Sequence, residues 1–257
     1  MHVSIETLLG RLRIDDGRYV EIESKRRIVP EQVKQIREFL LKRRRVKYQR
    51  GVIFFDQYLD TPKRELFRRG ASLRLRYKKD GLNVYLQYKG PGFHRAGLLF
   101  RSEFSTERLR DELREESHHD IVQFSHTSVR RILARHAPPA MARAMHDHLG
   151  VGVISRITES PIVCAYQKEK FLVELGTVFL EPSLDRVFAF HIDRKGPHPL
   201  STFCEYENEI KALGESLEAK LKRLDDLIEF DRALSRKFEF HPEPLDKYHR
   251  CESFFKR

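Results

Sequence analysis

Residues 18–28 have the sequence RYVEIESKRRI, in which apolar and charged side chains alternate. Val20 and Ile22 fall on one side of an extended chain, whereas Glu21, Glu23 and Lys25 fall on the other. A period of two residues is typical of a β-strand with one buried face. The segment therefore predicts a strand whose second face carries two carboxylates and an ammonium group.

The same alternation returns later in the chain with complementary charges. The segments SLRLR, LQYK, RSE and CEYENEIK each place their charged groups on one face, and these groups are Arg74, Arg76, Lys89, Arg101, Glu103, Glu205, Glu207 and Glu209. When an antiparallel sheet closes on itself, one face of every strand lines the interior. We therefore expect an α+β fold: a closed or nearly closed antiparallel β-barrel with a charged interior and with helices packed outside.

Apolar residues at helical spacing predict the remaining elements. A helix should begin at Pro30, before the basic run Lys42–Arg45, and a short one should end at Arg69. Residues 106–149 should form a helical insertion, and strands should run from Val151 to about Lys211. Residues 79–81, Lys-Asp-Gly, predict a hairpin turn. We expect one domain over residues 1–257, with C-terminal helices at about 213–257 that include one long helix over 213–238.

The composition points to a polyanionic partner. The 257 residues include 49 Lys and Arg against 38 Asp and Glu, a formal net charge of +11. Nucleic acid, an anionic membrane surface and a phosphate-rich small molecule all suit this balance. The three cysteines lack CxxC spacing, and no apolar run approaches the roughly 20 residues of a membrane span. Residues 1–13 lack the apolar run of a signal peptide, so we expect a cytoplasmic protein.

Carboxylates placed among arginines and lysines narrow the choice of partner. Arg and Lys bind phosphoryl oxygens, whereas carboxylates supply the hard oxygen ligands of Mg²⁺ or Mn²⁺. A basic module that only binds a polyanion gains nothing from these glutamates. The mixture therefore favours a metal-dependent enzyme that acts on a triphosphate-containing small molecule.

These segments resemble the CYTH domain, the family of triphosphate tunnel metalloenzymes. The resemblance rests on the ExExK strand, YLDTP, RGASLRLRYK, LQYKGP and RSE in the first half, and on SLDRV, CEYENEIK and LDKYHR in the second. ExExK alone is weakly specific, but the ordered series is strong. The resemblance covers most of residues 18–250 and implies a triphosphate held with Mg²⁺ or Mn²⁺ inside a barrel.

The resemblance also implies roles for individual residues. Metal binding would involve Glu21, Glu23, Asp185, Glu205 and Glu207. The phosphates would be held by Lys25, Arg74, Arg76, Lys89, Arg101, Arg156 and Lys247. Catalysis would rest on Glu21, Glu23 and Lys25. Glu174 and Asp185 both suit the acidic position of the second half, with Asp185 favoured, and Glu209 is expected at the rim.

Several functions stay open at this level. The primary hypothesis is hydrolysis of inorganic tripolyphosphate, with nucleoside or thiamine triphosphate as further substrates. A cyclase of the adenylate cyclase type, a polyphosphate-forming transferase, and a non-catalytic module for polyphosphate or RNA are the alternatives. Neither a membrane nor nucleic acid is expected as the main partner, and a homodimer is open. His146 and His148 suggest a metal pair, but we expect exposed histidines there.

Overall fold

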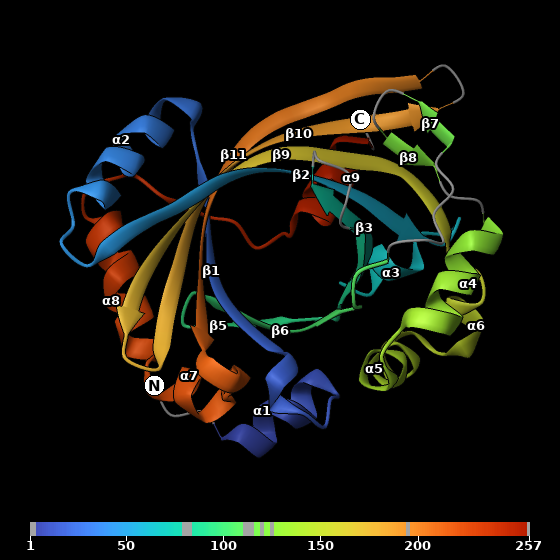
Figure 1. Ribbon diagram of the computed structural model, residues 1–257, viewed down its shortest axis with the longest axis horizontal. Helices are drawn as coiled ribbons and strands as arrows, with labels where there is room; N and C mark the ends of the chain where they lie inside the picture. Colours follow the sequence, from blue (N-terminus) through green and yellow to red (C-terminus); the bar gives the residue numbers. More distant parts are fainter. Residues whose placement is uncertain are drawn as a thin grey trace.

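A computed structural model describes residues 4–78, 84–109, 116–118, 121–123, 126–193 and 196–255 (Figure 1). Its strands are β1 (Val20–Ile28), β2 (Val46–Asp60), β3 (Ser72–Lys78), β4 (Val84–Lys89), β5 (Phe93–Arg95), β6 (Leu98–Ser105), β7 (Glu116–His118), β8 (Ile121–Gln123), β9 (Thr158–Leu175), β10 (Val178–Asp193), β11 (Gly196–Ala212) and β12 (His241–Pro242).

Eight of these strands form a ring of antiparallel pairs. Their order is β1, β11, β10, β9, β2, β3, β4 and β6, and a pairing of β6 with β1 closes the ring. Strands β9, β10 and β11 of the second half lie together between β2 and β1 of the first half, and β5 and β12 add to the edges. The result is the nearly closed antiparallel barrel, with helices, that the sequence predicts.

Alternation along each strand separates the two faces of the ring. On β1, Val20 and Ile22 are fully buried in a hydrophobic core on the outer side, where they meet Leu8 and Ile36 of the covering helices. The intervening residues Glu21, Glu23 and Lys25 face inward, as do their counterparts on the other strands. The apolar faces thus hold the helices, and the charged faces are left to line the interior.

The helices lie mainly around the outside of the ring (Figure 1). They are α1 (Ile5–Leu12), α2 (Pro30–Leu41), α3 (Glu65–Arg68), α4 (His126–His136), α5 (Pro139–Leu149), α6 (Val151–Ile154), α7 (Leu217–Lys222), α8 (Leu224–Ser235) and α9 (Lys247–Phe255), with 3₁₀ turns η1 (Gly17–Tyr19) and η2 (Leu213–Glu215). None of the helices in the described part of the chain is long and apolar enough to cross a membrane.

Helix α9 differs from the others because it packs on the inner face of the ring. Figure 1 shows it within the outline of the strands. The ring of Tyr248 stacks on Tyr58 of β2 with centroids 4.8 Å apart, and its hydroxyl donates a hydrogen bond to Asp60 over 2.8 Å. Tyr248 and Cys251 are fully buried in this contact. The C-terminal helix therefore occupies part of the interior of the barrel.

Several sequence predictions of local structure are wrong. Residues 106–149 are not continuously helical, because β7 and β8 pair there as a hairpin and Leu109 bridges to Val84. Residues 151–154 form α6 instead of a strand. The long helix over 213–238 is divided into η2, α7 and α8, because Gly214 has a φ of 65° and Ser216 caps a new helix start. Helix α1 was not anticipated, and the turn at 79–81 lies outside the described residues.

Candidate functional site

The ring encloses a cavity of about 170 Å³ whose wall is mostly charged. Among the described residues, nine cationic and seven acidic side chains line it. The sequence-predicted residues that it brings together are Glu21, Glu23, Lys25, Arg74, Arg76, Lys89, Arg101, Glu207 and Lys247. These nine residues come from five strands and from α9, and they converge on one space, as strand alternation predicts.

Glu21 is held by two cations from neighbouring strands. Lys89 Nζ lies 2.7 Å from its Oε1, and Arg101 Nε donates a hydrogen bond to its Oε2 over 2.6 Å. Burial alone would raise the pKa of Glu21, but Arg101 and Lys89 hold this pKa well below its ordinary value. Glu21 is therefore a carboxylate anion at neutral pH.

Glu23 has a different electrostatic environment, although it lies on the same strand face. Arg101 Nη2 donates a hydrogen bond to it over 2.8 Å, and Lys25 Nζ lies 4.0 Å away. Burial and the nearby charge of Glu21 raise the pKa of Glu23. Two carboxylates on one strand therefore differ in how readily they accept a proton.

Arg74 and Arg76 share a partner that the sequence analysis missed. Asp56 of β2 is fully buried and accepts hydrogen bonds from Arg74 Nη1 over 2.9 Å and from Arg76 Nε over 2.8 Å. Although burial opposes it, the two guanidinium groups lower the pKa of Asp56 to about 2. Arg76 also donates to the hydroxyl of Tyr166. Asp56 thus orients both arginines toward the cavity.

A first group of carboxylates, here called the front cluster, consists of Glu21, Glu103 and Glu209. One carboxylate oxygen of each lies within 4.8 Å of the others. The side chains of Glu103 and Glu209 are 24% and 23% exposed, so the cluster is reachable from the cavity. Burial raises the pKa of Glu209 to about 7. Lys211 lowers this pKa, but the negative charges of Glu21 and Glu103 raise it.

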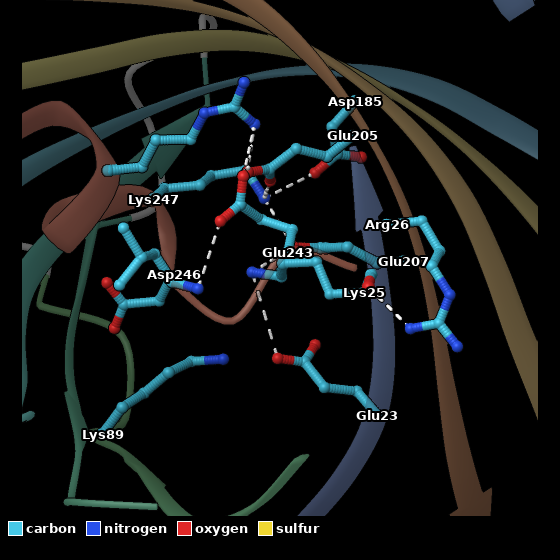
Figure 2. A network of polar contacts seen from close by, with 12 residues as sticks. Glu23, Lys25, Arg26, Lys89, Asp185, Glu205, Glu207, Glu243, Asp246 and Lys247 are labelled. Atoms are coloured by element: carbon cyan, nitrogen blue, oxygen red, sulfur yellow. Dashed lines mark hydrogen bonds and ion pairs between the residues drawn. The ribbon is translucent and has the colours of Figure 1, made fainter. Parts of the chain in front are cut away.

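A second group, here called the rear cluster, consists of Asp185, Glu205 and Glu207. Its carboxylate oxygens also lie within 4.8 Å of one another. Asp185 and Glu205 have fully buried side chains and do not line the cavity. Figure 2 shows this cluster together with Lys247, whose side chain points into it. The predicted metal ligands are therefore divided between two places.

Three further lysines and a glutamate line the cavity without having been predicted as site residues. They are Lys168, Lys170, Lys211 and Glu181. Lys168 lies 2.7 Å from Glu207, and Lys170 lies 3.5 Å from Glu181. The signal was present in the sequence, because Lys168 and Lys170 flank Glu169 with the same period of two as Arg74 and Arg76.

Asp246, also missed, connects α9 to the cavity wall. Its carboxylate accepts hydrogen bonds from Ser72 over 3.3 Å and from Arg101 over 3.4 Å. His249, one turn further along, lies 2.7 Å from the other carboxylate oxygen. Burial alone would raise the pKa of Asp246, but His249 and Arg101 hold it well below its ordinary value.

Three expectations from the sequence need comment. Arg156 lies outside the cavity and instead forms a half-exposed ion pair with Glu65, so it is not placed to bind the same phosphates. Glu174 pairs with Lys47 on the outer surface, whereas Asp185 faces the interior. His148 was expected to be exposed but is buried. Its Nε2 is hydrogen-bonded to the carbonyl oxygen of Leu12 and its Nδ1 to the hydroxyl of Tyr88.

The outer side of the site is stabilised by Asp231 of α8. Its carboxylate accepts hydrogen bonds from Tyr206 over 3.0 Å, from Asn208 over 2.9 Å and from Ser24. Ser24 and Asn208 are direct cross-strand partners of β1 and β11. Their neighbours in sequence carry the inward charges, so this contact sets the register of both strands behind the cavity.

The oxygen atoms of the front cluster are chemically suited to bind a divalent metal ion. It supplies carboxylate oxygens from three different strands, which are the ligands that Mg²⁺ and Mn²⁺ prefer. Lys89 and Arg101 contact carboxylates of the same cluster. The front cluster thus combines carboxylate oxygens with adjacent cationic side chains.

A family model for the CYTH domain matches residues 20–232. The chain therefore belongs to the CYTH domain family, as the motifs predict. A search of the curated proteins finds no match.

Solved structures with a similar fold include HpAC1 from Hippeastrum, named as an adenylyl cyclase and described with a dominant triphosphatase activity. It is 16% identical over 91% of this chain and 95% of its own, with a TM-score of 0.60. An adenylate cyclase-type protein from Bacillus halodurans is 17% identical over 88% and 94%, with a TM-score of 0.46. The RNA triphosphatase Pct1 of S. pombe is 10% identical over 86% and 87%, with a TM-score of 0.45.

Proposed function

We propose that this protein is a divalent-metal-dependent triphosphatase whose preferred substrate is inorganic tripolyphosphate. The observation that carries the proposal is the front cluster, which places three carboxylates next to Lys89 and Arg101 in one enclosed cavity. A polyanion-binding module requires only the cations. An enzyme that aligns a triphosphate with Mg²⁺ or Mn²⁺ requires both kinds of group.

Each part of the wall has a proposed task. Glu21, Glu103 and Glu209 would hold the ion, which when bound would offset the charge of the phosphoryl oxygens. Phosphate oxygens would be bound by Lys25, Arg74, Arg76, Lys89 and Arg101, and by the newly found Lys168, Lys170 and Lys211. Glu23 has a raised pKa beside the front cluster and is our candidate for the group that accepts a proton from the attacking water.

The size and polarity of the cavity favour an inorganic substrate. The enclosed space is about 170 Å³. Among its described lining residues, Phe54 is the only one with a purely apolar side chain, and that side chain is partly exposed. Aromatic and aliphatic side chains usually dominate the pockets that bind organic molecules. A nucleoside or thiamine group would meet charged side chains over most of this wall. The triphosphate itself is therefore the part of a substrate that the cavity recognises best.

The neighbours named as adenylyl cyclases make cyclisation of a nucleoside triphosphate the second candidate. Cyclisation needs a position for the ribose and base as well as for the phosphates. The charged wall offers less for these groups than for phosphate, so hydrolysis is preferred here.

The test is phosphate release from tripolyphosphate with Mg²⁺ or Mn²⁺, compared with a sample containing a chelator. ATP, GTP, thiamine triphosphate and an RNA 5′-triphosphate would be assayed in parallel, together with cyclic nucleotide and polyphosphate formation. We expect tripolyphosphate to have the highest kcat/KM and the chelator to abolish turnover. Cyclic AMP as the main product, or tight binding of tripolyphosphate without release of phosphate, would contradict the proposal.

A further inference from the structure

Lys247 occupies the centre of the rear cluster. Its Nζ lies 2.8 Å from Asp185, 3.0 Å from Glu205 and 2.7 Å from Glu207. Figure 2 shows the lysine reaching from α9 into the space between these three carboxylates. Three carboxylate oxygens around one positive centre is also the arrangement that a divalent metal ion takes in proteins.

The rear cluster is built for a cation, not for solvent. The side chains of Asp185 and Glu205 are fully buried, and that of Lys247 is 6% exposed. Buried carboxylates are costly unless a positive group compensates them. Within the described residues, Asp185 Oδ1 is buried without a hydrogen-bond partner, so the cluster retains an unused oxygen ligand.

We propose that the ammonium group of Lys247 serves as a tethered cation in the rear cluster, in the place of a second divalent metal ion. The inference rests on the proposed function, because it concerns how many metal ions that function uses. It assigns one exchangeable ion to the front cluster and none to the rear cluster while Lys247 is in place. It also changes the expected role of Lys247 from holding phosphate to neutralising carboxylates.

The surroundings of the rear cluster oppose a second divalent ion. Lys168 lies 3.2 Å from Asp185, Lys25 lies 2.9 Å from Glu207, and Arg250 lies 3.4 Å from Glu205. With Lys247, four positive groups contact three carboxylates, and the front cluster has the same number of cationic groups, namely Arg74, Lys89, Arg101 and Lys211. The rear cluster differs because Lys247 contacts all three of its carboxylates, so a second divalent ion there would have to displace this ammonium group.

Helix α9 keeps Lys247 in this position through contacts on both sides of it. Asp246 is bound to Ser72 and Arg101 of the strand ring, and Tyr248 donates its hydroxyl hydrogen to Asp60. Because these neighbours are anchored, the backbone of Lys247 is held beside the three carboxylates. The tethered cation is therefore part of the packing of α9 in the barrel.

The experiment counts Mn²⁺ ions per chain by electron paramagnetic resonance and equilibrium dialysis, without any substrate. The wild type should bind one ion, and Lys247→Met should bind two, because the vacated cluster becomes a metal site. Mn²⁺ should also raise the Tm of Lys247→Met by roughly 5 °C more than that of the wild type. Two ions in the wild type, or one ion and no additional rise in Tm in the variant, would overturn the proposal.

Lys220→Met is the matched control, because Lys220 is an equally buried lysine on α7 that bonds to Val20 and Glu215 outside the cavity. Its loss should lower Tm without adding a Mn²⁺ site. If Lys247→Met does not fold, two other variants decide. Glu209→Gln should remove the single Mn²⁺ of the wild type, whereas Glu205→Gln should leave Mn²⁺ binding unchanged, and the reverse pattern would refute the assignment. The number of Mn²⁺ ions bound per chain is measured without turnover. A negative result in the triphosphatase assay would therefore contradict the proposed function without changing the result of this experiment.

Discussion

Arg101 and Glu21 lie directly opposite each other on the paired strands β6 and β1, and Arg101 Nε donates a hydrogen bond to Glu21 over 2.6 Å. The same guanidinium group reaches Glu23 through Nη2 over 2.8 Å. One arginine therefore holds both carboxylates of the ExExK strand. A phosphate group bound in the cavity would need the same N–H donors of Arg101. The substrate and the two carboxylates would therefore compete for this guanidinium group.

Glu21→Gln should lower kcat for tripolyphosphate by at least about a hundredfold, because it removes an anionic ligand from the front cluster. The amide is similar in size, so the circular dichroism spectrum should be unchanged. Glu174→Gln, at a 57% exposed carboxylate on the outer surface, is the control and should keep wild-type turnover. Wild-type rates in Glu21→Gln would show that the front cluster is not catalytic.

Arg74→Ala and Arg76→Ala should each reduce kcat/KM roughly ten- to a hundredfold, the loss of one sheltered charge-assisted contact of about 1.5–3 kcal/mol. Arg44→Ala and Arg45→Ala remove the same charge from exposed positions and should cost well under about 1 kcal/mol. All four would be compared at two salt concentrations. Equal, salt-sensitive losses in the four variants would mean that diffuse positive charge binds the substrate.

Asp231→Ala should lower the free energy of unfolding by about 2–4 kcal/mol, because it leaves the buried donors Ser24, Tyr206 and Asn208 without their shared acceptor. Urea denaturation measures the loss. Glu229→Ala, at an exposed position of the same helix, should change stability by less than about 0.5 kcal/mol. Equal effects in the two variants would argue against a role for Asp231 in holding β1 and β11 together.

His249→Gln should destabilise the protein more at low pH than at high pH. Burial alone would lower the pKa of His249, but Asp246 raises it above the ordinary 6.5. Protonated His249 therefore stabilises the folded state. This contribution is complete at pH values below the pKa of the unfolded state, and it is lost as the pH rises through the pKa of the folded state. The difference in unfolding free energy from wild type should therefore be about 1 kcal/mol larger at about pH 5.5 than at about pH 9.

The control for this pH dependence is His146→Gln, whose ring is 60% exposed at the end of α5. Of the two variants, His249→Gln should show the larger change with pH over the same range. A His249→Gln difference that does not change with pH would show that the imidazole contributes through packing alone.

The alternation in residues 18–28 and 204–211 was enough to predict which side chains face inward, because the direction of a side chain along a strand depends only on the local backbone. Glu21, Arg74 and Glu207 reached one cavity for this reason. A charged strand face can also lie in solvent, so the closed ring was predicted from the complementary charges of several strands, and the pairing of β6 with β1 closes it.

The grouping of those side chains depended on tertiary structure. Glu209 joins Glu21 and Glu103 from two other strands because the stagger of the ring brings their levels together, and no spacing in the chain encodes that stagger. Arg156 carries the expected charge but leaves the barrel because α6 replaces the predicted strand before it.

The docking of α9 was likewise invisible in the sequence. LDKYHR predicted a lysine at the barrel, but only the packed helix decided that Lys247 contacts Asp185, Glu205 and Glu207 at the cavity wall. Strand alternation is a local property of the chain, whereas strand register and helix docking arise from contacts between residues far apart in sequence. The sequence by itself therefore determined the family, the fold and the charges of the site, and the tertiary contacts determined which carboxylates lie together.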